Sequence, residues 1–424
     1  MRPLKGVRIV ELGRVLACPF AGMILAELGA DVIKVEHPRG GDETRSYEPF
    51  FAPGGGEEAG AQDGPVPGQE AGAASRADAQ GGERSGYFHA FNRGKRSVTV
   101  NFRTEAGRQI IRDLAATSDA LIENFPTGTL TRYGLDWETL RTVNGRLVYV
   151  SCTGFGQTGP ERSRKGYDTV FQAMGGVMSL TGAPGGGPVK AGIPVADLTS
   201  GLWIAVAVAS ALIGRQTSGR GAYVDLSMMD GLISLMGLPA ARFFALGEVP
   251  ERMGTEHPGR VPSATFCTAD GGHIHITGAD QHWAGLCRAL EIEAWGSDPQ
   301  LATNSGRVAA RPAVMARLAG AIGALPRDEV MARLDREGVP NGPVRNLGEM
   351  LSAPQTVARD LVRKVYHPVI GTLPGIALPL RFDGFDPPGF TRGPLLGEHS
   401  DEVLTGLLGY SPEQVAALRE DGIL

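Results

Sequence analysis

The stretch from residue 7 to residue 36 limits most strongly how this chain can fold. Val7–Leu12 and Asp31–Glu36 have the apolar, β-branched composition of strands. Between them, Phe20–Leu28 has the apolar spacing of a helix and ends at Gly29. A strand, a helix and a strand within about thirty residues require a parallel strand pair with a crossover helix. The sequence therefore predicts the beginning of an open α/β sheet.

The turn after the first predicted strand runs from Gly13 to Cys18. It lacks the G-x-G-x-x-G pattern that a dinucleotide-binding fold places there. An NAD-dependent enzyme is therefore not expected.

Further strands and helices alternate along the first half of the chain, and this alternation ends near Arg252. The predicted strands are Ser97–Phe102, Ala120–Glu123, Leu147–Thr153 and Ala222–Ser227, and the predicted helices are Glu105–Thr117 and Leu232–Leu246. A hairpin over 265–277, helices at Trp283–Leu290 and Arg311–Leu325, and a last helix at Pro412–Glu420 follow. We expect a large α/β domain over 1–225, a linker helix and smaller α+β domain over 226–340, and a segment over 341–424 that returns to the large domain.

Residues 53–86 differ in composition from the rest of the chain. Half of them are Gly or Ala, and Val66 is the only large aliphatic residue. Such a segment buries too little apolar surface to offset its ordering entropy. We expect a flexible surface insertion, with an active-site lid as the alternative.

Charge and cysteine usage exclude several classes of protein. The net charge of -5, a pI near 6.0 and the lack of a Lys/Arg block argue against nucleic acid as a partner. The start lacks the apolar core of a signal peptide, and the apolar run 202–213 is too short to span a bilayer. The cysteines have neither disulfide nor zinc-site spacing. We expect a cytoplasmic protein without metal or membrane contact.

Asp197 is the most prominent candidate for chemistry. It follows a turn-like Gly192-Ile193-Pro194 and precedes a long apolar run. This pattern predicts a carboxylate in the first turn of a buried helix, where the helix dipole favours negative charge. Taken alone, the segment favours a simple helix N-cap, and it is the surrounding sequence that favours a chemical role.

Several phrases, in this order, resemble the family III CoA-transferases. They are Pro3-Leu4-x-Gly6-Val7-x-Ile9, 28–36 (LGADVIKVE), Asn92-x-x-Lys95-Arg96-Ser97, Glu123-Asn124-Phe125, 154–160 (GFGQTGP), Gly166-Tyr167-Asp168, Gly338-Val339-Pro340-x-Gly342-Pro343 and Pro394-x-Leu396-Gly397-Glu398-His399. The resemblance implies a Rossmann-like large domain, a smaller α+β domain and an interlocked homodimer. It also implies CoA thioesters as substrates, with no permanently bound cofactor.

The resemblance places the catalytic nucleophile at Asp197. A carboxylate that attacks a thioester forms a mixed anhydride and releases the CoA thiolate, so CoA transfer needs neither ATP nor metal. By resemblance, a loop containing Gly254 and Gly259 closes over the intermediate. The implied CoA contacts are Val15, Leu16, Ala17, Lys95, Asn124, Phe125, Arg132 and Lys165, with Phe125 stacked on adenine and the cations on phosphates.

Tyr167 and Asp168 separate two reactions within this superfamily. The α-methylacyl-CoA racemases have a histidine base at the position of Tyr167, and a tyrosine, with its ordinary pKa near 10, is a poor base at neutral pH. The resemblance therefore favours CoA transfer, with succinyl-CoA as donor and a dicarboxylate as acceptor. An isomerase of CoA esters, racemase-like or moving CoA within one molecule, is the alternative. Arg252 and Arg260 are candidate partners for a second acceptor carboxylate.

Overall fold

The computed structural model describes residues 1–52 and 82–424. The chain forms two compact units, and each is described by itself. The first contains Met1–Gly175, Gly192–Gly237 and Val357–Leu424, and the second contains Gly176–Ala191 and Leu238–Thr356. These units group residues 176–191, 226–237 and 341–356 differently from the spans 1–225, 226–340 and 341–424, which stay a prediction of domain organisation.

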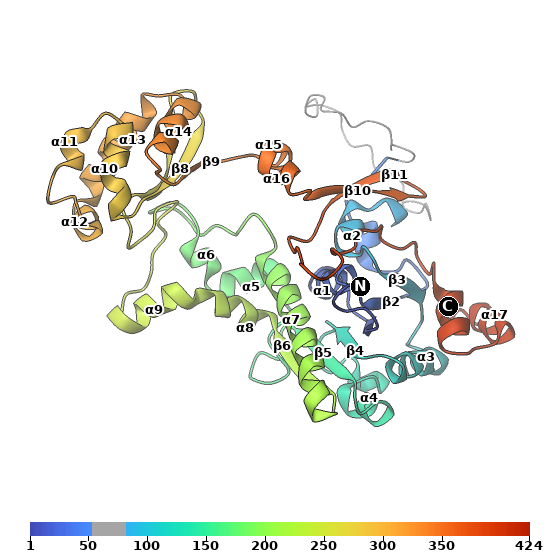
Figure 1. Ribbon diagram of the computed structural model, residues 1–424. Coiled ribbons are helices and arrows are strands. Elements are labelled where there is room, and N and C mark those ends of the chain that lie inside the picture. The colour runs from blue at the N-terminus through green and yellow to red at the C-terminus, as the bar shows by residue number, and fades with distance from the viewer. Residues whose placement is uncertain (53–81) are drawn as a thin grey trace. The chain divides into compact units, whose positions relative to one another are not determined.

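A six-stranded parallel sheet forms the centre of the first unit (Figure 1). Its strands are β1 (Arg8–Glu11), β2 (Asp31–Glu36), β3 (Arg96–Thr99), β4 (Ala120–Glu123), β5 (Val148–Thr153) and β6 (Ala222–Ser227). Their order in space is β3-β2-β1-β4-β5-β6, so the order changes direction between β1 and β4. In register, Val10 lies opposite Ile33 on one side and Leu121 on the other. The predicted open α/β sheet is confirmed.

The helices of the first unit cover both faces of this sheet. Those α-helices are α1 (Ala17–Glu27), α2 (Gly86–Phe91), α3 (Glu105–Ala116), α4 (Trp137–Val143), α5 (Asp168–Met174), α7 (Val195–Ser218), α8 (Met228–Ile233) and α17 (Pro412–Glu420). Short turns of other helix types are η1 (Glu43–Ser46), η2 (Gly82–Arg84), η3 (Thr131–Tyr133), η4 (Ser234–Met236) and η5 (Glu402–Leu407). A two-stranded ribbon of β10 (Val362–His367) and β11 (Gly371–Ile376) completes the unit.

Neighbouring residues of one strand enter two different cores. Ile9 packs with residues of α1 and α7, whereas Val10 packs with residues of α3, α4 and the C-terminal helices. This follows from the period of two in a strand, because successive side chains point to opposite faces. Burial on both faces explains the apolar runs that made β2 and β4 predictable to the residue, whereas β6, whose bounds were also predicted to the residue, has alternating exposed positions.

Helices α1 and α7 approach each other closely at Gly201. A Cβ atom there would lie 2.8 Å from the Ala17 carbonyl oxygen and 2.8 Å from Phe20 Cδ1. Only glycine leaves room for this contact. The close approach brings the N-terminal turn of α7 beside the N-terminal turn of α1.

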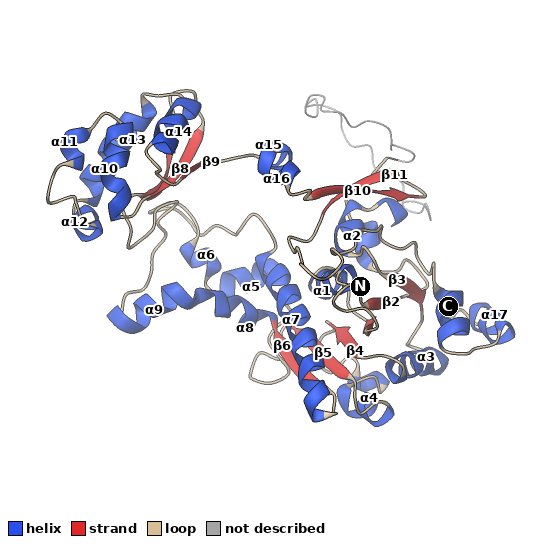
Figure 2. Ribbon diagram, in the orientation of Figure 1, coloured by secondary structure: helices blue, strands red, loops and turns tan. Residues whose placement is uncertain are grey.

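The second unit packs helices against an antiparallel sheet (Figure 2). Its strands are β7 (Ser263–Cys267), β8 (His273–Thr277) and β9 (Asn341–Pro343), and its helices are α6 (Val177–Leu180), α9 (Gly237–Leu246), α10 (Asp280–Ala289), α11 (Glu293–Gly296), α12 (Asn304–Ala309), α13 (Arg311–Gly323), α14 (Arg327–Arg336), α15 (Leu347–Ser352) and α16 (Pro354–Ala358). Ile274, Ile276, Trp283 and Leu318 are among its buried core residues. The predicted hairpin and both predicted helices are present.

The apolar helices are longer and less buried than the sequence suggested. The run 202–213 lies inside the 24-residue α7, and the predicted helix 232–246 is divided into α8, η4 and α9, with glycines at 231 and 237. By length and composition alone, Val195–Ser218 and Met228–Leu246 are apolar enough to cross a membrane, which is weak evidence because core helices pass the same test. The expected lack of membrane contact stays a prediction.

The predicted insertion 53–86 falls mostly outside the described residues. Its last residues, 82–86, form η2 and the start of α2, which corrects that end of the prediction. The chain on either side is held together, because Phe51 N donates to the Arg84 carbonyl at 2.9 Å and Gly86 N to the Pro49 carbonyl at 2.7 Å. Ser85 is fully buried, and its hydroxyl accepts a bond from Phe88 N.

Candidate active site

The candidate residues of the first unit gather where the parallel strands end. The turns that follow β1 and β4 flank the point where the strand order changes direction. In open α/β sheets, ligands bind in the crevice outside the carboxyl ends of the strands at this point. The topology therefore places a ligand site next to the turn Gly13–Leu16 and the residues after Glu123.

Asp197 lies in the first turn of α7, as predicted, but it is not the N-cap. Pro194 occupies the N-cap position. Burial, and then the nearby carboxylate of Asp168, raise the pKa of Asp197 to about 7. A desolvated carboxylate without a cation beside it is more basic and therefore a better nucleophile than an exposed one.

Asp168 lies across from Asp197 and binds the same helix terminus. Its Oδ1 accepts hydrogen bonds from Ala196 N at 2.8 Å and Asp197 N at 3.4 Å, and its Oδ2 accepts one from Gln172 Nε2 at 2.6 Å. Although Asp168 begins α5, its carboxylate therefore satisfies orphan donors of α7. Tyr167 is 79% exposed, which excludes a role as a core phenol within this chain.

Aromatic side chains that the sequence analysis did not single out lie around these carboxylates. The rings of Tyr47 and Tyr87 meet edge-on at 5.5 Å, Tyr87 contacts Phe91 at 5.7 Å, and Phe91 contacts Phe20 at 5.8 Å. Burial, and then the Asp197 carboxylate, raise the pKa of Tyr87 to about 12. The phenol therefore stays protonated and remains a hydrogen-bond donor near Asp197.

The turn after β1 has an unusual backbone. Val15 has a φ of +67°, in the left-handed region that β-branched residues rarely adopt. At Gly13 a Cβ atom would lie 2.1 Å from Cys18 Cβ, so only glycine fits. Leu16 and Ala17 are each 1% exposed. Of the three predicted CoA contacts in this turn, two are therefore almost completely covered, and only Val15 is partly exposed.

Lys95 does not lie where the sequence analysis expected it. Its ammonium donates to Glu11 Oε1 at 3.0 Å, the Pro19 carbonyl at 2.8 Å and Asn92 Oδ1 at 2.8 Å, and its side chain is fully buried. Burial lowers its pKa to about 8. A contact with a CoA phosphate does not fit this arrangement, because all three ammonium protons are already shared.

Lys34 and Asp42 complete this buried cluster. Lys34 Nζ lies 3.0 Å from Glu11 Oε1 and 2.9 Å from Asp42 Oδ2, and both partners are buried. Burial alone would lower the pKa of Lys34, but the carboxylates of Asp42 and Glu11 outweigh it and raise the pKa. Burial alone would raise the pKa of Asp42, and the Lys34 ammonium instead lowers it to about 2.

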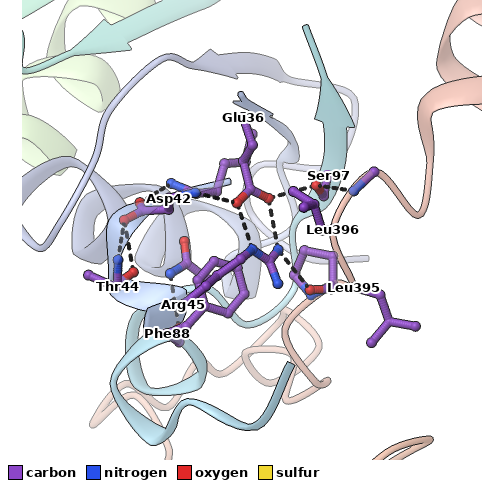
Figure 3. Close-up of polar contacts among 12 residues, drawn as sticks. Glu36, Asp42, Thr44, Arg45, Phe88, Ser97, Leu395 and Leu396 are labelled. Carbon is purple, nitrogen blue, oxygen red and sulfur yellow. Dashed lines mark hydrogen bonds and ion pairs between the residues drawn. The ribbon is translucent and has the colours of Figure 1, made fainter. Parts of the chain in front are cut away.

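A second buried ion pair, between Arg45 and Glu36, holds the backbone of Asp42 (Figure 3). Arg45 binds Glu36 with two parallel hydrogen bonds of 2.8 Å, and its guanidinium lies 3.7 Å above the ring of Phe88. Glu36 Oε2 also accepts a bond from Asp42 N at 3.0 Å, and Glu36 Oε1 accepts one from Ser97 Oγ at 2.6 Å. Figure 3 shows these groups converging on the Glu36 carboxylate.

Asn124 and Phe125 follow β4 and face the turn after β1. Asn124 Oδ1 accepts from Arg14 N and Asn124 Nδ2 donates to the Arg14 carbonyl, both at 2.8 Å. Phe125 contacts Phe102 edge-on at 5.7 Å, and the Arg14 guanidinium lies 5.2 Å from its ring centre.

A cavity of about 310 Å³ opens beside Phe125, lined in part by Glu123, Trp137, Tyr149 and Tyr223. Burial, only partly offset by a hydrogen bond from Ser151, raises the pKa of Glu123 to about 7. The cavity is therefore aromatic with a carboxyl group that is partly protonated at neutral pH.

The remaining predicted contacts lie on exposed segments. Arg132 is in η3, and Lys165 is in the loop before α5. Gly254 and Gly259 belong to the second unit, where Gly254 N donates to the Gly182 carbonyl and Asn304 Nδ2 donates to the Gly259 carbonyl, both at 2.9 Å. In the same unit, the guanidinium of Arg252 binds the carbonyls of Ser179 and Gly186, and Arg260 is exposed.

Within residues 1–52 and 82–424, no group of three or more His, Cys, Asp or Glu side chains is placed to hold a metal ion. Cys18, Cys152 and Cys287 are buried thiols, and Cys267 is exposed.

The sequence analysis missed the charged cluster of Glu11, Lys34, Asp42 and Arg45. A signal for it exists, because Glu11 and Lys34 are charged residues that directly follow buried apolar residues in β1 and β2. In a sheet with both faces covered, such charges require buried partners.

Comparisons with known proteins agree with this geometry. A family model described as CoA-transferase family III matches residues 4–400. A succinate–glutarate CoA-transferase of Agrobacterium fabrum is 38% identical over 96% of this chain and 96% of its own length. A succinyl-CoA:mesaconate CoA-transferase of Haloarcula marismortui is 35% identical over 95% of this chain and 96% of its own. The crystal structure of a CAIB/BAIF family protein from Brucella suis has a TM-score of 0.79 at 40% identity and covers 96% of this chain and 99% of that one. The chain belongs to CoA-transferase family III.

Proposed function

We propose that this enzyme transfers CoA from succinyl-CoA to a dicarboxylate, with Asp197 as the nucleophile. The observation that carries the proposal is the desolvated carboxylate of Asp197 at the start of α7, whose pKa burial and Asp168 raise to about 7. The substrates of the similar enzymes, succinate with glutarate and succinyl-CoA with mesaconate, support the choice of donor and acceptor class.

The chemistry proceeds by exchange of one acyl bond for another. An Asp197 oxygen attacks the thioester carbonyl, the C–S bond breaks, and a mixed anhydride and CoA thiolate form. The thiolate attacks the aspartyl carbonyl, releases the donor acid and leaves an aspartyl-CoA thioester. The acceptor carboxylate attacks this thioester, and the returning thiolate attacks the acceptor's acyl carbon, which restores the Asp197 carboxylate.

The positive end of the α7 dipole favours the oxyanion that forms at Asp197 in each attack, while the N–H groups of residues 195–198 are already hydrogen-bonded within the protein. Asp168 takes a positioning role, because it holds the N–H groups of Ala196 and Asp197 while its charge keeps Asp197 basic. Tyr167, exposed and not itself a base, contacts substrate. Gly254 and Gly259 contribute a loop over the intermediate.

For CoA, we place the pantetheine chain along the backbone of Val15, Leu16 and Ala17. The aromatic cavity beside Phe125 supports the adenine at that end, because carboxyl groups there accept from an amino group and repel phosphates. Arg132 and Lys165 are exposed cations that suit the phosphates. No permanently bound cofactor is required by this chemistry.

We further propose that the chain works as a homodimer in the cytoplasm. Helix α7 exposes a row of apolar side chains, Leu202, Trp203, Val206 and Ile213, each at least 42% exposed. In α9 no residue is buried, and Phe244 is 82% exposed. Apolar surface of this extent is typical of a protein–protein interface. Light scattering after size-exclusion chromatography tests this, and a monomer at micromolar concentration would contradict it.

The decisive experiment mixes the enzyme with succinyl-CoA and pooled carboxylic acids and identifies the CoA thioesters by mass spectrometry. We expect a dicarboxylyl-CoA that forms with the wild type and not with Asp197→Ala. If no new thioester forms and deuterium from heavy water enters the α-carbon of an acyl-CoA, the racemase-like alternative replaces this proposal.

A further inference from the structure

Side chains hold four backbone atoms of the turn after β1. Lys34 Nζ donates to the Gly13 carbonyl at 3.0 Å, and Asp42 Oδ1 accepts from Val15 N at 3.3 Å. Between them, Asn124 Oδ1 accepts from Arg14 N and Nδ2 donates to the Arg14 carbonyl, both at 2.8 Å. The turn is therefore fixed from the buried side by an ion pair and from the neighbouring strand by one amide.

The conformation that these bonds hold is one the turn would not adopt by itself. Val15 has a φ of +67°, and its branched side chain disfavours this left-handed backbone. A strained residue persists only where its surroundings impose the conformation. Without the bonds to Asn124 and Asp42, Val15 would relax to negative φ, and the backbone of residues 14–16 would move.

The bridge from Asn124 crosses the point where ligands bind in such a sheet. Asn124 follows β4, Arg14 follows β1, and the strand order changes direction between these two strands. The Asn124 side chain thus joins the two sides of the crevice at the sheet edge, together with the Arg14 guanidinium, which lies over Phe125.

We propose that Asn124 is a positioning residue. It holds Val15 in its left-handed conformation, and the turn Gly13–Leu16 that is shaped in this way binds acyl-CoA. The proposal rests on the proposed function, because it takes the turn around Val15 as the CoA-binding surface. Asp42 and Lys34 act from the buried side. Each of these two side chains is 1% exposed, so neither reaches a ligand directly.

The test is a double-mutant cycle with Asn124→Asp, which keeps the size of the side chain and replaces the donor Nδ2 by an oxygen facing the Arg14 carbonyl. We expect the KM for succinyl-CoA and the Kd for free CoA to rise about tenfold, with kcat changed less than about twofold. Asn124→Ala, which removes both bonds without adding charge, is the second variant if the first folds poorly.

The second arm repeats Asn124→Asp in a Val15→Gly background. Glycine adopts positive φ about as readily as negative φ, so the turn no longer depends on Asn124 to the same degree. We expect the rise in Kd caused by Asn124→Asp to shrink to about threefold or less in that background. An equal rise in both backgrounds would mean that Asn124 contacts CoA itself and would overturn the proposal.

Asn144→Asp is the matched control. Asn144 also binds backbone with its amide, donating to the carbonyls of Ala115 and Ser118 at 2.9 Å each and accepting from Arg146 N at 3.0 Å. A general loss of stability would affect both variants, whereas loss of positioning raises KM and Kd in Asn124→Asp alone. Unchanged Kd in both Asn124 variants would refute the proposal.

The readouts separate this proposal from the proposed function. Calorimetric titration with free CoA measures the Kd for CoA binding in the absence of catalysis. If the wild type binds CoA, the two Asn124 variants bind it weakly and no dicarboxylate accepts CoA, the proposed function fails and the positioning role stands.

Discussion

Two groups of buried carboxylates occupy the same edge of one sheet, and they differ in their partners. Glu11, Glu36 and Asp42 lie beside Lys34, Lys95 or Arg45 at 2.8–3.0 Å. Asp197 instead has another carboxylate, Asp168, as its charged neighbour. The neighbouring cation lowers the pKa of Asp42 to about 2, whereas burial and Asp168 raise the pKa of Asp197 to about 7.

The difference shows how one fold can contain carboxylates that stabilise the structure and a carboxylate that is suited to react. A carboxylate neutralised by a buried cation is fixed in place and weakly basic, so it holds backbone but does not attack an acyl carbon. A carboxylate that is desolvated without a cation keeps its basicity and its nucleophilicity. Under the proposed function, the paired group therefore builds the site, and Asp197, which forms no ion pair with residues 1–52 or 82–424, is its nucleophile.

The largest expected effect comes from removing the unpaired carboxylate. Asp197→Asn keeps the size of the side chain but no longer forms an anhydride, so we expect kcat to fall at least about a thousandfold. The measurement is the initial rate of thioester exchange at saturating succinyl-CoA. Activity within tenfold of the wild type would break the comparison, because Asp197 would then be structural as well.

The next effect comes from breaking the paired group. Lys34→Met removes the cation that lies beside the buried carboxylates of Glu11 and Asp42. Removing one partner of a buried ion pair typically lowers the free energy of unfolding by about 3–5 kcal/mol. Urea unfolding monitored by circular dichroism measures the loss.

The matched control is Arg141→Met, whose ion pair with Glu138 is exposed at the surface. There we expect a loss below about 1 kcal/mol. Equal losses at both positions would mean that burial does not distinguish the two kinds of pair.

Asp197→Asn should also stabilise the folded chain at neutral pH. Because the folded pKa of Asp197 lies near 7, above its ordinary 3.8, the folded state holds an extra proton between these values and wild-type stability falls as pH rises through them. The free energy of unfolding gained by Asp197→Asn is therefore absent below about pH 4 and complete above about pH 7. At about 1.4 kcal/mol per pKa unit, it is at most about 4 kcal/mol.

Urea unfolding of wild type and variant at pH 4 and pH 8 tests this prediction. Asp383→Asn, at an exposed position, serves as the control and should show no such pH dependence. A variant that is less stable than the wild type at pH 8 would show that Asp197 has a stabilising partner.

The smallest expected effect is a shift in a pH profile. Asp168→Asn removes the carboxylate that helps to raise the pKa of Asp197, while its side-chain oxygen still accepts from Ala196 N. The acid limb of kcat/KM should therefore move to lower pH. Movement to higher pH, or an unchanged limb, would contradict the assigned repulsion between Asp168 and Asp197.

The centre of the parallel sheet was predictable because strands buried on both faces read as apolar runs: β2 and β4 match the expected bounds, as does the more exposed β6. Short helices such as α4, α5 and α12 were missed, since six or seven residues carry too little periodicity. The ribbon of β10 and β11 was also missed, although turn signals were noted near it.

For the site, the phrase around Asp197 correctly predicted its place in the first turn of a helix. The roles of single residues were harder to predict, because sequence does not tell whether a cation is exposed or paired. Lys95 was expected at a phosphate and is instead enclosed by Glu11, Asn92 and the Pro19 carbonyl. Partners that are distant in the chain decide this, such as Glu11 and Lys95, which are 84 positions apart.

The hydrogen-bonded junction at residues 49–51 and 84–86 has a consequence for how this chain can change. Because the backbone on the two sides of this junction is hydrogen-bonded together, a change in the number of residues between them should cost little, about 0.6 kcal/mol for each doubling of a flexible loop. A tag or a second domain inserted between residues 51 and 84, next to α2, should therefore leave the rest of the fold intact.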